Sequence, residues 1–272
     1  MMVSCNHDKV TVINSEYKNK YDKCILCNPL DRYESVIPKI QLDFRNIIGY
    51  DEIKKILQST VDNSFTGINS THVLLEGAPS TAKSVFLQTL NKNLRGYGYN
   101  SHYINAESMT SAGVIDYLFN EDVQYLNLDE LDKLEKKHQQ MFLNLLQSGI
   151  LQETKFKKTR LKIMENLVCI ASANWILKIS EPLVTRFLTF HLEPYTMQEY
   201  EIIARALLEF KYKKTPEIAL YITEQVWNTY TQFRYELPVI RNVEQVAKLS
   251  GNDKASVDVI LAGLKRYSNI KR

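Results

Sequence analysis

One short segment between an apolar run and a helical pattern constrains this chain more than any other feature of its sequence. Residues 72–76 (HVLLE) form an apolar run of strand length, and residues 84–94 have helical spacing. Between them, residues 76–84 read EGAPSTAKS, which fits G-x-x-x-x-G-K-[ST] except for alanine at the second glycine. A strand leading through such a loop into a helix predicts a phosphate-binding site, because N–H groups at a helix start attract anions.

The pattern assigns a task to each residue type in the loop. We expect Lys83 to reach the β and γ phosphates and the Ser84 hydroxyl to bind Mg²⁺. Ala82 departs from the pattern, because alanine disfavours the positive φ that glycine adopts freely. The loop is still expected to work if φ at Ala82 is negative. The candidate nucleotide-binding residues of the loop are Gly77, Ala78, Pro79, Ser80, Thr81, Ala82, Lys83 and Ser84.

Two adjacent carboxylates end a second apolar run. Residues 123–128 (VQYLNL) are expected to form a strand, and Asp129 and Glu130 follow it. Ligands bind at the carboxyl ends of parallel strands, so this pair can face the phosphate loop. We expect Asp129 to bind Mg²⁺, directly or through water, and Glu130 to orient and deprotonate the attacking water. A chance strand–turn–helix and a solvated acidic turn are the ordinary alternatives, but the occurrence of both motifs in order argues against them.

Strand-like and helical segments alternate in the middle of the chain, and helical spacing dominates its last part. This alternation predicts an α/β fold, with a parallel sheet covered by helices on both faces. We divide the chain into an N-terminal module (1–30), an α/β nucleotide-binding core (31–194) and a helical lid (195–272). The other expected strands are 101–105, 167–172 and 188–192, and the other expected helices are those around 137–147 and at 196–210, 216–234, 242–249 and 254–267.

The N-terminal module carries a cysteine and histidine cluster. Cys5 and His7, followed by Cys24 and Cys27, supply four ligands of the kind that hold a tetrahedral Zn²⁺. A segment of this length cannot build a sufficient core alone, so a structural zinc ribbon is expected. It could bind DNA, a partner protein or the next subunit; a flexible tail with free thiols is the alternative. No apolar run is long enough to span a membrane and no signal peptide is evident, so we expect a cytoplasmic protein.

The phosphate loop and the acidic strand end resemble those of the AAA+ ATPases, and further segments fit this resemblance. Residues 171–174 (ASAN) resemble sensor 1, which implies that Asn174 holds the attacking water or contacts the γ-phosphate. Residues 181–187 (EPLVTRF) resemble the segment of the arginine finger, which implies that Arg186 reaches the ATP of a neighbouring subunit. An ordinary turn asparagine and a surface arginine in a local salt bridge are the alternatives.

Two other segments take their interpretation from the same resemblance. Residues 240–247 (IRNVEQVA) resemble sensor 2, which implies that Arg241 touches the γ-phosphate from within the same subunit. Residues 44–50 (FRNIIGY) resemble the segment before the first core helix, where Ile47 and Ile48 would pack near the adenine. Packing in the protein core is an equally good interpretation of these two isoleucines.

A basic hairpin is expected at 149–163, where apolar and polar residues alternate on both sides of a cationic centre. It resembles the extra hairpin before sensor 1 in the RuvB-like and MCM-like helicases and the MoxR-like ATPases. Its cations would face the pore of a ring and contact DNA phosphates, without reading sequence. A solvated charged hairpin is the alternative. The cations are Lys155, Lys157, Lys158, Arg160 and Lys162.

The resemblance implies an ATP-hydrolysing motor that uses ATP and Mg²⁺ and forms a homo-oligomeric ring, expected to be a hexamer. A DNA-dependent helicase, translocase or branch-migration motor is our leading interpretation, because of the basic hairpin and the zinc module. A protein-remodelling ATPase of the MoxR type and an initiator or clamp-loader-like switch are the alternatives.

Overall fold

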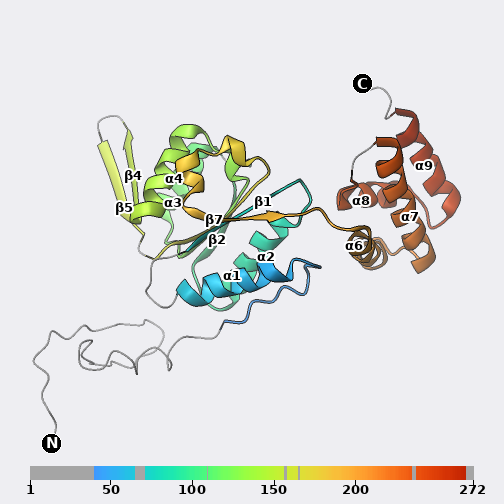
Figure 1. The fold of residues 1–272 in the computed structure, drawn as a ribbon, viewed down its shortest axis with the longest axis horizontal. Coiled ribbons are helices and arrows are strands. Elements are labelled where there is room, and N and C mark those ends of the chain that lie inside the picture. Colours follow the sequence, from blue (N-terminus) through green and yellow to red (C-terminus); the bar gives the residue numbers. More distant parts are fainter. Residues whose placement is uncertain are drawn as a thin grey trace, which may run out of the picture.

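The computed structural model describes residues 40–64, 71–108, 110–155, 158–164, 166–234 and 237–267. An α/β core and a bundle of helices lie at opposite ends of a connecting segment that follows strand β7 (Figure 1). The four residues of the predicted zinc site, Cys5, His7, Cys24 and Cys27, lie outside the described residues. No helix in the described ranges has the length and apolar character that crossing a bilayer requires.

The core is built on a five-stranded sheet in which every strand pair is parallel, in the order β2-β3-β6-β1-β7. Strands β3 and β6 are buried at every residue, as expected for parallel strands covered on both faces. The expected strands are confirmed with shifted ends; the run at 123–128, for example, becomes a strand that begins at Tyr125 and includes Asp129. The strands are β1 (His72–Gly77), β2 (Ser101–Asn105), β3 (Tyr125–Asp129), β6 (Val168–Ala173) and β7 (Phe187–Leu192).

Helices cover both faces of this sheet, and each face has its own apolar cluster. Helices α1 (Asp51–Ser64) and α2 (Lys83–Gly96) pack on one face, and α3 (Ser111–Asn120) and α4 (Lys136–Ser148) pack on the other. The α/β fold that the alternation predicts is therefore present, although α1 and α3 were not among the expected helices. Short helical turns follow β3 and β6 at η1 (Leu131–Lys133), η2 (Ile176–Lys178) and α5 (Glu181–Val184).

The expected hairpin is present as an antiparallel pair of strands, β4 (Ile150–Lys155) and β5 (Lys158–Ile163). Gly149 ends α4 with a φ of 69°, a left-handed conformation that glycine adopts without strain. The hairpin lies at the end of the core opposite the helical bundle (Figure 1).

The helical bundle has a third apolar cluster, separate from the two clusters of the core. Thr196 caps its first helix through a reciprocal pair of bonds with Glu199. The helix expected at 216–234 is α-helical only to Thr229 and then widens into a π-helical turn. The helix expected from Asn242 begins two residues earlier, because the Asn242 side chain accepts a bond from Val239 N. The elements are α6 (Met197–Phe210), α7 (Pro216–Thr229), η3 (Tyr230–Arg234), α8 (Ile240–Leu249) and α9 (Lys254–Tyr267).

Candidate nucleotide-binding site

The loop between β1 and α2 is shaped by close approaches and left-handed residues. A Cβ added to Gly77 would lie 2.5 Å from the carbonyl oxygen of Leu192, so only glycine fits beside β7. Ser80 and Ala82 have φ values of 68° and 60°. The condition of a negative φ at Ala82, set from the sequence, is therefore not met. Alanine here has the left-handed conformation that glycine would have in the usual pattern, which costs about 1–2 kcal/mol. The conformation is required because the chain turns at Ala82 and so places its carbonyl at the start of α2.

Lys83 is buried inside this loop. Its ammonium donates to the carbonyl oxygens of Gly77 (2.8 Å) and Ala78 (2.6 Å) and to Thr81 Oγ1 (3.1 Å). Burial lowers the pKa of Lys83, whereas the nearby carboxylates, Asp129 foremost, oppose that shift. These contacts hold the ammonium where the loop meets the first turn of α2, the position from which it could reach a phosphate.

Asp129 is the last residue of β3, and hydroxyl groups hold both of its carboxylate oxygens. Oδ1 accepts a hydrogen bond from Ser172 on β6, and Oδ2 accepts one from the Tyr103 hydroxyl on β2 at 2.7 Å. Burial and this bond raise the pKa of Tyr103 to about 12, so the phenol remains a donor at neutral pH. Each carboxylate oxygen has further lone pairs, so the group can still receive bonds from the water shell of a Mg²⁺ ion.

Glu130 follows in a left-handed conformation, with a φ of 59°. Its N–H donates to Ser172 Oγ at 3.0 Å, and its Oε2 is buried with no hydrogen-bond partner within the described residues. Burial and a hydrogen bond with Glu107 raise the pKa of Glu130. A carboxylate made more basic in this way suits a general base. Sequence reasoning missed Glu107, which follows β2 and carries no motif of its own.

Asn174 lies just beyond the end of β6, close to a second buried carboxylate. Its N–H donates to Asp132 Oδ1 at 3.2 Å, and the other oxygen of Asp132 is buried with no hydrogen-bond partner within the described residues. The bond ties the end of β6 to the η1 turn after β3. Because that turn begins directly after Glu130, the bond keeps Asn174 near Glu130, and both residues line the same pocket.

A single pocket of about 400 Å³ joins these groups, a volume typical of small-molecule sites. Lys83 and the pair Asp129–Glu130 line it together, and so do Ile47 and Ile48. Gly77, Ala78 and Thr81 do not line it and bind the Lys83 ammonium instead; Gly77 and Thr81 are buried and Ala78 is exposed. Three residues of the bundle and its connecting segment also line the pocket and were missed, because their spacing reads as ordinary core. The lining residues are Asn46, Ile47, Ile48, Pro79, Ser80, Ala82, Lys83, Ser84, Val85, Asp129, Glu130, Ser172, Asn174, Tyr195, Ile203 and Ile240.

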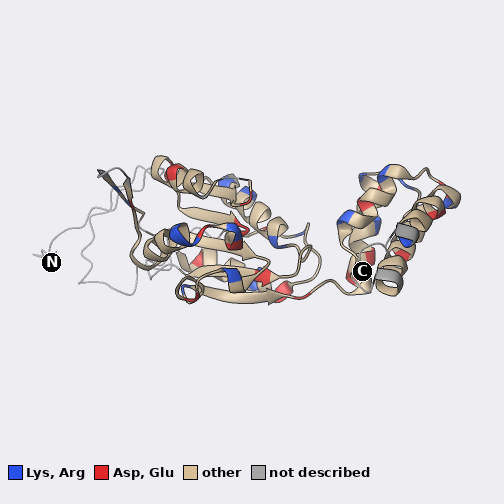
Figure 2. Cartoon of the chain, turned by 90° about the horizontal axis from the view of Figure 1, so that it is seen from above, with Lys and Arg blue, Asp and Glu red and all other residues tan. Residues whose placement is uncertain are grey.

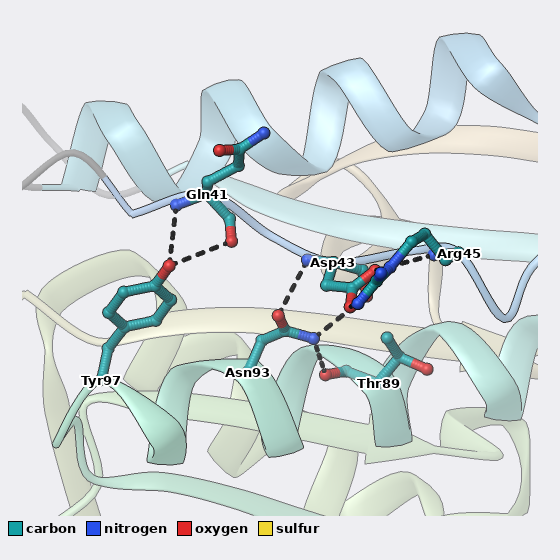
Figure 3. A network of polar contacts seen from close by, with 6 residues as sticks. All are labelled: Gln41, Asp43, Arg45, Thr89, Asn93 and Tyr97. Atoms are coloured by element: carbon teal, nitrogen blue, oxygen red, sulfur yellow. Dashed lines mark hydrogen bonds and ion pairs between the residues drawn. The ribbon is translucent and has the colours of Figure 1, made fainter.

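The segment that carries Ile47 and Ile48 is tied to α2 by side chains (Figure 3). The Asn93 amide accepts from Asp43 N (2.8 Å) and donates to Asp43 O (3.2 Å), as a neighbouring strand would. The Tyr97 hydroxyl bonds both peptide groups of Gln41, and Asn46 Nδ2 donates to Thr89 Oγ1 at 2.8 Å. These bonds lay the segment along the helix that begins at the phosphate loop, which brings both isoleucines to the pocket.

Two predicted arginines do not line the pocket. Arg186 is exposed beyond α5 and donates to Gln147 Oε1, near the end of α4, at 3.1 Å. Arg241 is exposed in the first turn of α8, and its neighbour Ile240 faces the pocket instead. Arg186 therefore does not reach the pocket of its own chain, and Arg241 would need a different side-chain or lid position to reach a phosphate.

Two of the five hairpin cations are bound by the core. Arg160 forms ion pairs with Asp116 on α3 and Glu153 on β4. Lys162 Nζ donates to the carbonyl oxygens of Leu118 (3.0 Å) and Glu121 at the end of α3. The side chains at 155, 157 and 158 lie outside the described part of the chain. Elsewhere, basic and acidic residues are interspersed along the helices of the core and of the bundle (Figure 2).

Comparison with known proteins bears on the fold alone. No family model matches the chain, and no curated protein matches it in sequence. A solved variant of Thermotoga maritima RuvB aligns with a TM-score of 0.50 and 18% identity over 78% of this chain and 74% of that one. A structure described as the Thermotoga maritima RuvB Holliday junction branch migration motor aligns with a TM-score of 0.49 and 18% identity over 79% and 74%. The parallel sheet, the loop between β1 and α2 and the first of these alignments together show the α/β fold of the P-loop NTPases.

Proposed function

We propose that the chain is an ATPase of the AAA+ type that binds ATP with Mg²⁺ in the pocket between its core and its helical lid. The observation that carries the proposal is the shared pocket, which the phosphate loop with Lys83 and the acidic pair Asp129–Glu130 line together. One bound triphosphate could therefore meet both groups. The proposal takes 31–194 as the core and 195–272 as the lid.

The phosphate end of the pocket fits a triphosphate and its metal ion. The start of α2 presents N–H groups, and Lys83 adds a buried positive charge. The Ser84 hydroxyl lines the pocket beside this charge, and Asp129 lies opposite. Hydroxyl and carboxylate oxygens are the donors that Mg²⁺ prefers. When bound, the metal ion would neutralise charge on the phosphates.

The other end of the pocket fits a flat, largely apolar base. Ile47 and Ile48 line it from the segment tied to α2, and Ile203 and Ile240 line it from the lid. Because aliphatic side chains reach it from both units, a bound base would contact core and lid together. Nucleotide binding would in this way bias the lid position, which is how ATP turnover could drive a motion.

The acidic end of the pocket fits the hydrolytic step. Glu130 accepts the proton of the attacking water, and its raised pKa improves it as a base. Asn174 lines the same end and can hold that water or a phosphate oxygen. An in-line attack also needs a cation to stabilise charge on the transferred phosphoryl group. We assign this task to Arg186 of a neighbouring copy, since Arg186 does not line the pocket of its own copy. Arg241 of the same copy is a second candidate for this cation if the lid closes.

The proposed assembly follows from that assignment. A residue that completes the site of the next copy is available to every copy when head-to-tail contacts close into a ring, and we propose a ring of six subunits. We propose DNA as the substrate of the motor, bound through phosphates by the tip of the β4–β5 hairpin, with the zinc module at 1–30 as a further contact to DNA, a partner protein or the next subunit. A protein-remodelling ATPase of the MoxR type and an initiator or clamp-loader-like switch use the same site, so they differ only in what stimulates hydrolysis.

A binding and hydrolysis experiment tests the ATPase. Lys83→Ala should abolish ATP binding in calorimetry, whereas Glu130→Gln should keep binding and lose hydrolysis, because it removes only the base. Lys92→Ala, an exposed lysine on the same helix α2, is the matched control and should behave as wild type. Wild-type protein that binds no ATP, or Lys83→Ala protein that binds it equally well, would refute the proposal.

A second experiment tests the substrate. ATPase rates are compared with no DNA and with single-stranded, duplex or branched DNA. The DNA proposal expects stimulation that weakens as salt rises, because phosphate contacts release counterions. The double variant Lys157→Ala/Lys158→Ala should remove this stimulation and keep the basal rate, since it spares Arg160, which anchors the hairpin. A rate that no DNA changes would favour the protein-remodelling alternative.

A further inference from the structure

The hydroxyl of Ser172 lies between the two acidic residues of the site, and no motif assigns it a task. Ser172 is on β6, the neighbour of β3 in the sheet, and is only 1% exposed. Its Oγ contacts Asp129 Oδ1 and also lies 3.0 Å from the backbone nitrogen of Glu130. One buried hydroxyl therefore touches both residues on which the proposed chemistry depends.

The direction of both hydrogen bonds follows from the groups involved. A serine hydroxyl has one proton and two lone pairs, a carboxylate accepts only, and a peptide N–H donates only. The proton of Ser172 must therefore go to Asp129, and a lone pair of the same oxygen accepts from Glu130. The two bonds form a chain of hydrogen bonds from the backbone N–H of Glu130, through the Ser172 hydroxyl, to the carboxylate of Asp129. Neither bond can reverse while Asp129 is ionised.

The turn after β3 explains why such a link is needed. The ladder between β3 and β6 ends at the pair Leu128 and Ala171, so Glu130 N–H has no strand partner. Glu130 also has a left-handed φ of 59°, which residues with a side chain disfavour. Its Oε2 makes no hydrogen bond within the described residues, and the side chain's bond is to Glu107, which follows β2 rather than β6. The Glu130 carbonyl accepts from Lys133 N within the following turn, so the Ser172 bond is the one that ties the backbone of Glu130 to the neighbouring strand β6.

We propose that Ser172 is a positioning residue that sets the metal-binding carboxylate of Asp129 and the water-activating Glu130 in a fixed relation. This inference rests on the proposed ATPase function and adds a residue to it. Tyr103 has only half of this task, since its hydroxyl bonds Asp129 Oδ2 and, among the bonds of the described residues, none joins it to Glu130. Loss of Tyr103 should therefore disturb the metal site alone, whereas loss of Ser172 should disturb the metal site and the base together.

The test compares Ser172→Ala with two variants. Ser101→Ala is the matched control, because Ser101 is a similarly buried serine in the same sheet, and its hydroxyl bonds Asn91 and Asn127 instead. Tyr103→Phe removes the other bond to Asp129. We expect Ser172→Ala to lower kcat and to raise the Mg²⁺ concentration needed for half-maximal rate, each by about tenfold or more. ATP affinity measured in EDTA should not change. Tyr103→Phe should shift the Mg²⁺ dependence with little loss of kcat, and Ser101→Ala should do neither.

A readout without nucleotide separates this inference from the proposed function. Exchange of the Glu130 amide proton, followed by NMR in the free protein, should be about tenfold faster in Ser172→Ala and unchanged in Ser101→Ala, because a hydrogen-bonded amide exchanges only when the bond opens. Faster exchange in a protein that hydrolyses no ATP would refute the ATPase and leave the link standing. Unchanged exchange, or wild-type kcat and Mg²⁺ dependence in Ser172→Ala, would overturn the link. If Ser172→Ala does not fold, Ser172→Cys replaces it in the same measurements, because cysteine has a similar size and is a weaker hydrogen-bond donor.

Discussion

The left-handed conformation of Ala82 leads to a prediction of unusual sign. A residue with a Cβ pays about 1–2 kcal/mol in this region, and glycine does not. The gain from Ala82→Gly is reduced by the larger conformational entropy of glycine in the unfolded chain, about 0.4–1 kcal/mol. At a φ of 60° and ψ of 6° we therefore expect a net stabilisation of about 0.5–1 kcal/mol. The Phe86 N–H bond to the Ala82 carbonyl (2.9 Å) should persist, so the loop shape and ATP affinity should be kept.

Urea unfolding followed by circular dichroism measures this difference, with Ala112→Gly as the matched control. Ala112 lies in the first turn of helix α3, where φ is negative. The same chemical change should there destabilise the protein, by up to about 1 kcal/mol. Opposite signs for the two variants would support the reasoning. A destabilisation by Ala82→Gly equal to that of Ala112→Gly would refute it, because it would mean that Ala82 does not have a left-handed conformation in solution.

Three further predictions concern the stability of the protein. Gly77→Ala should destabilise the protein by about 1–3 kcal/mol, seen as a lower melting temperature, because its Cβ would clash with the Leu192 carbonyl. Burial lowers the pKa of His72 below 6.5, so the unfolded chain takes up the proton first. The free energy of unfolding should therefore fall as pH drops below 6.5, and less steeply in His72→Gln, as measured by urea unfolding between pH 7 and 5. Tyr50→Phe removes the hydroxyl bond to the Glu193 carbonyl (2.6 Å) and should cost about 0.5–1.5 kcal/mol in the same assay; no change would show that water replaces the bond.

The sheet and the phosphate loop could be predicted because the information for them is local. Buried parallel strands are apolar at nearly every residue, and β3 and β6 are buried throughout. The conformation of Ala82 could not be predicted in this way, because residue preference favours a negative φ and the required turn into α2 overrides it. The part of Ser172 in the site depends on the register between two strands far apart in sequence. Ile203 and Ile240 were missed for a similar reason, since helical spacing does not say which residues of an apolar face lie at the edge of a pocket.

The β4–β5 hairpin shows how the same limit affects a functional interpretation. Its alternation predicted two strands correctly, but its charge could not distinguish anchoring residues from binding residues. Arg160 and Lys162 are two residues apart, so both side chains leave β5 on the same face. Arg160 pairs with Glu153 across the ladder, and that carboxylate, with Asp116 on α3, directs this face of the hairpin towards the core. Both cations are already bound by the protein, so we assign the proposed DNA contact to Lys157 and Lys158. Arg160→Ala should lower the free energy of unfolding even without DNA, because it loosens the hairpin. Changes at 157 and 158 should alter the ATPase rate only when DNA is present.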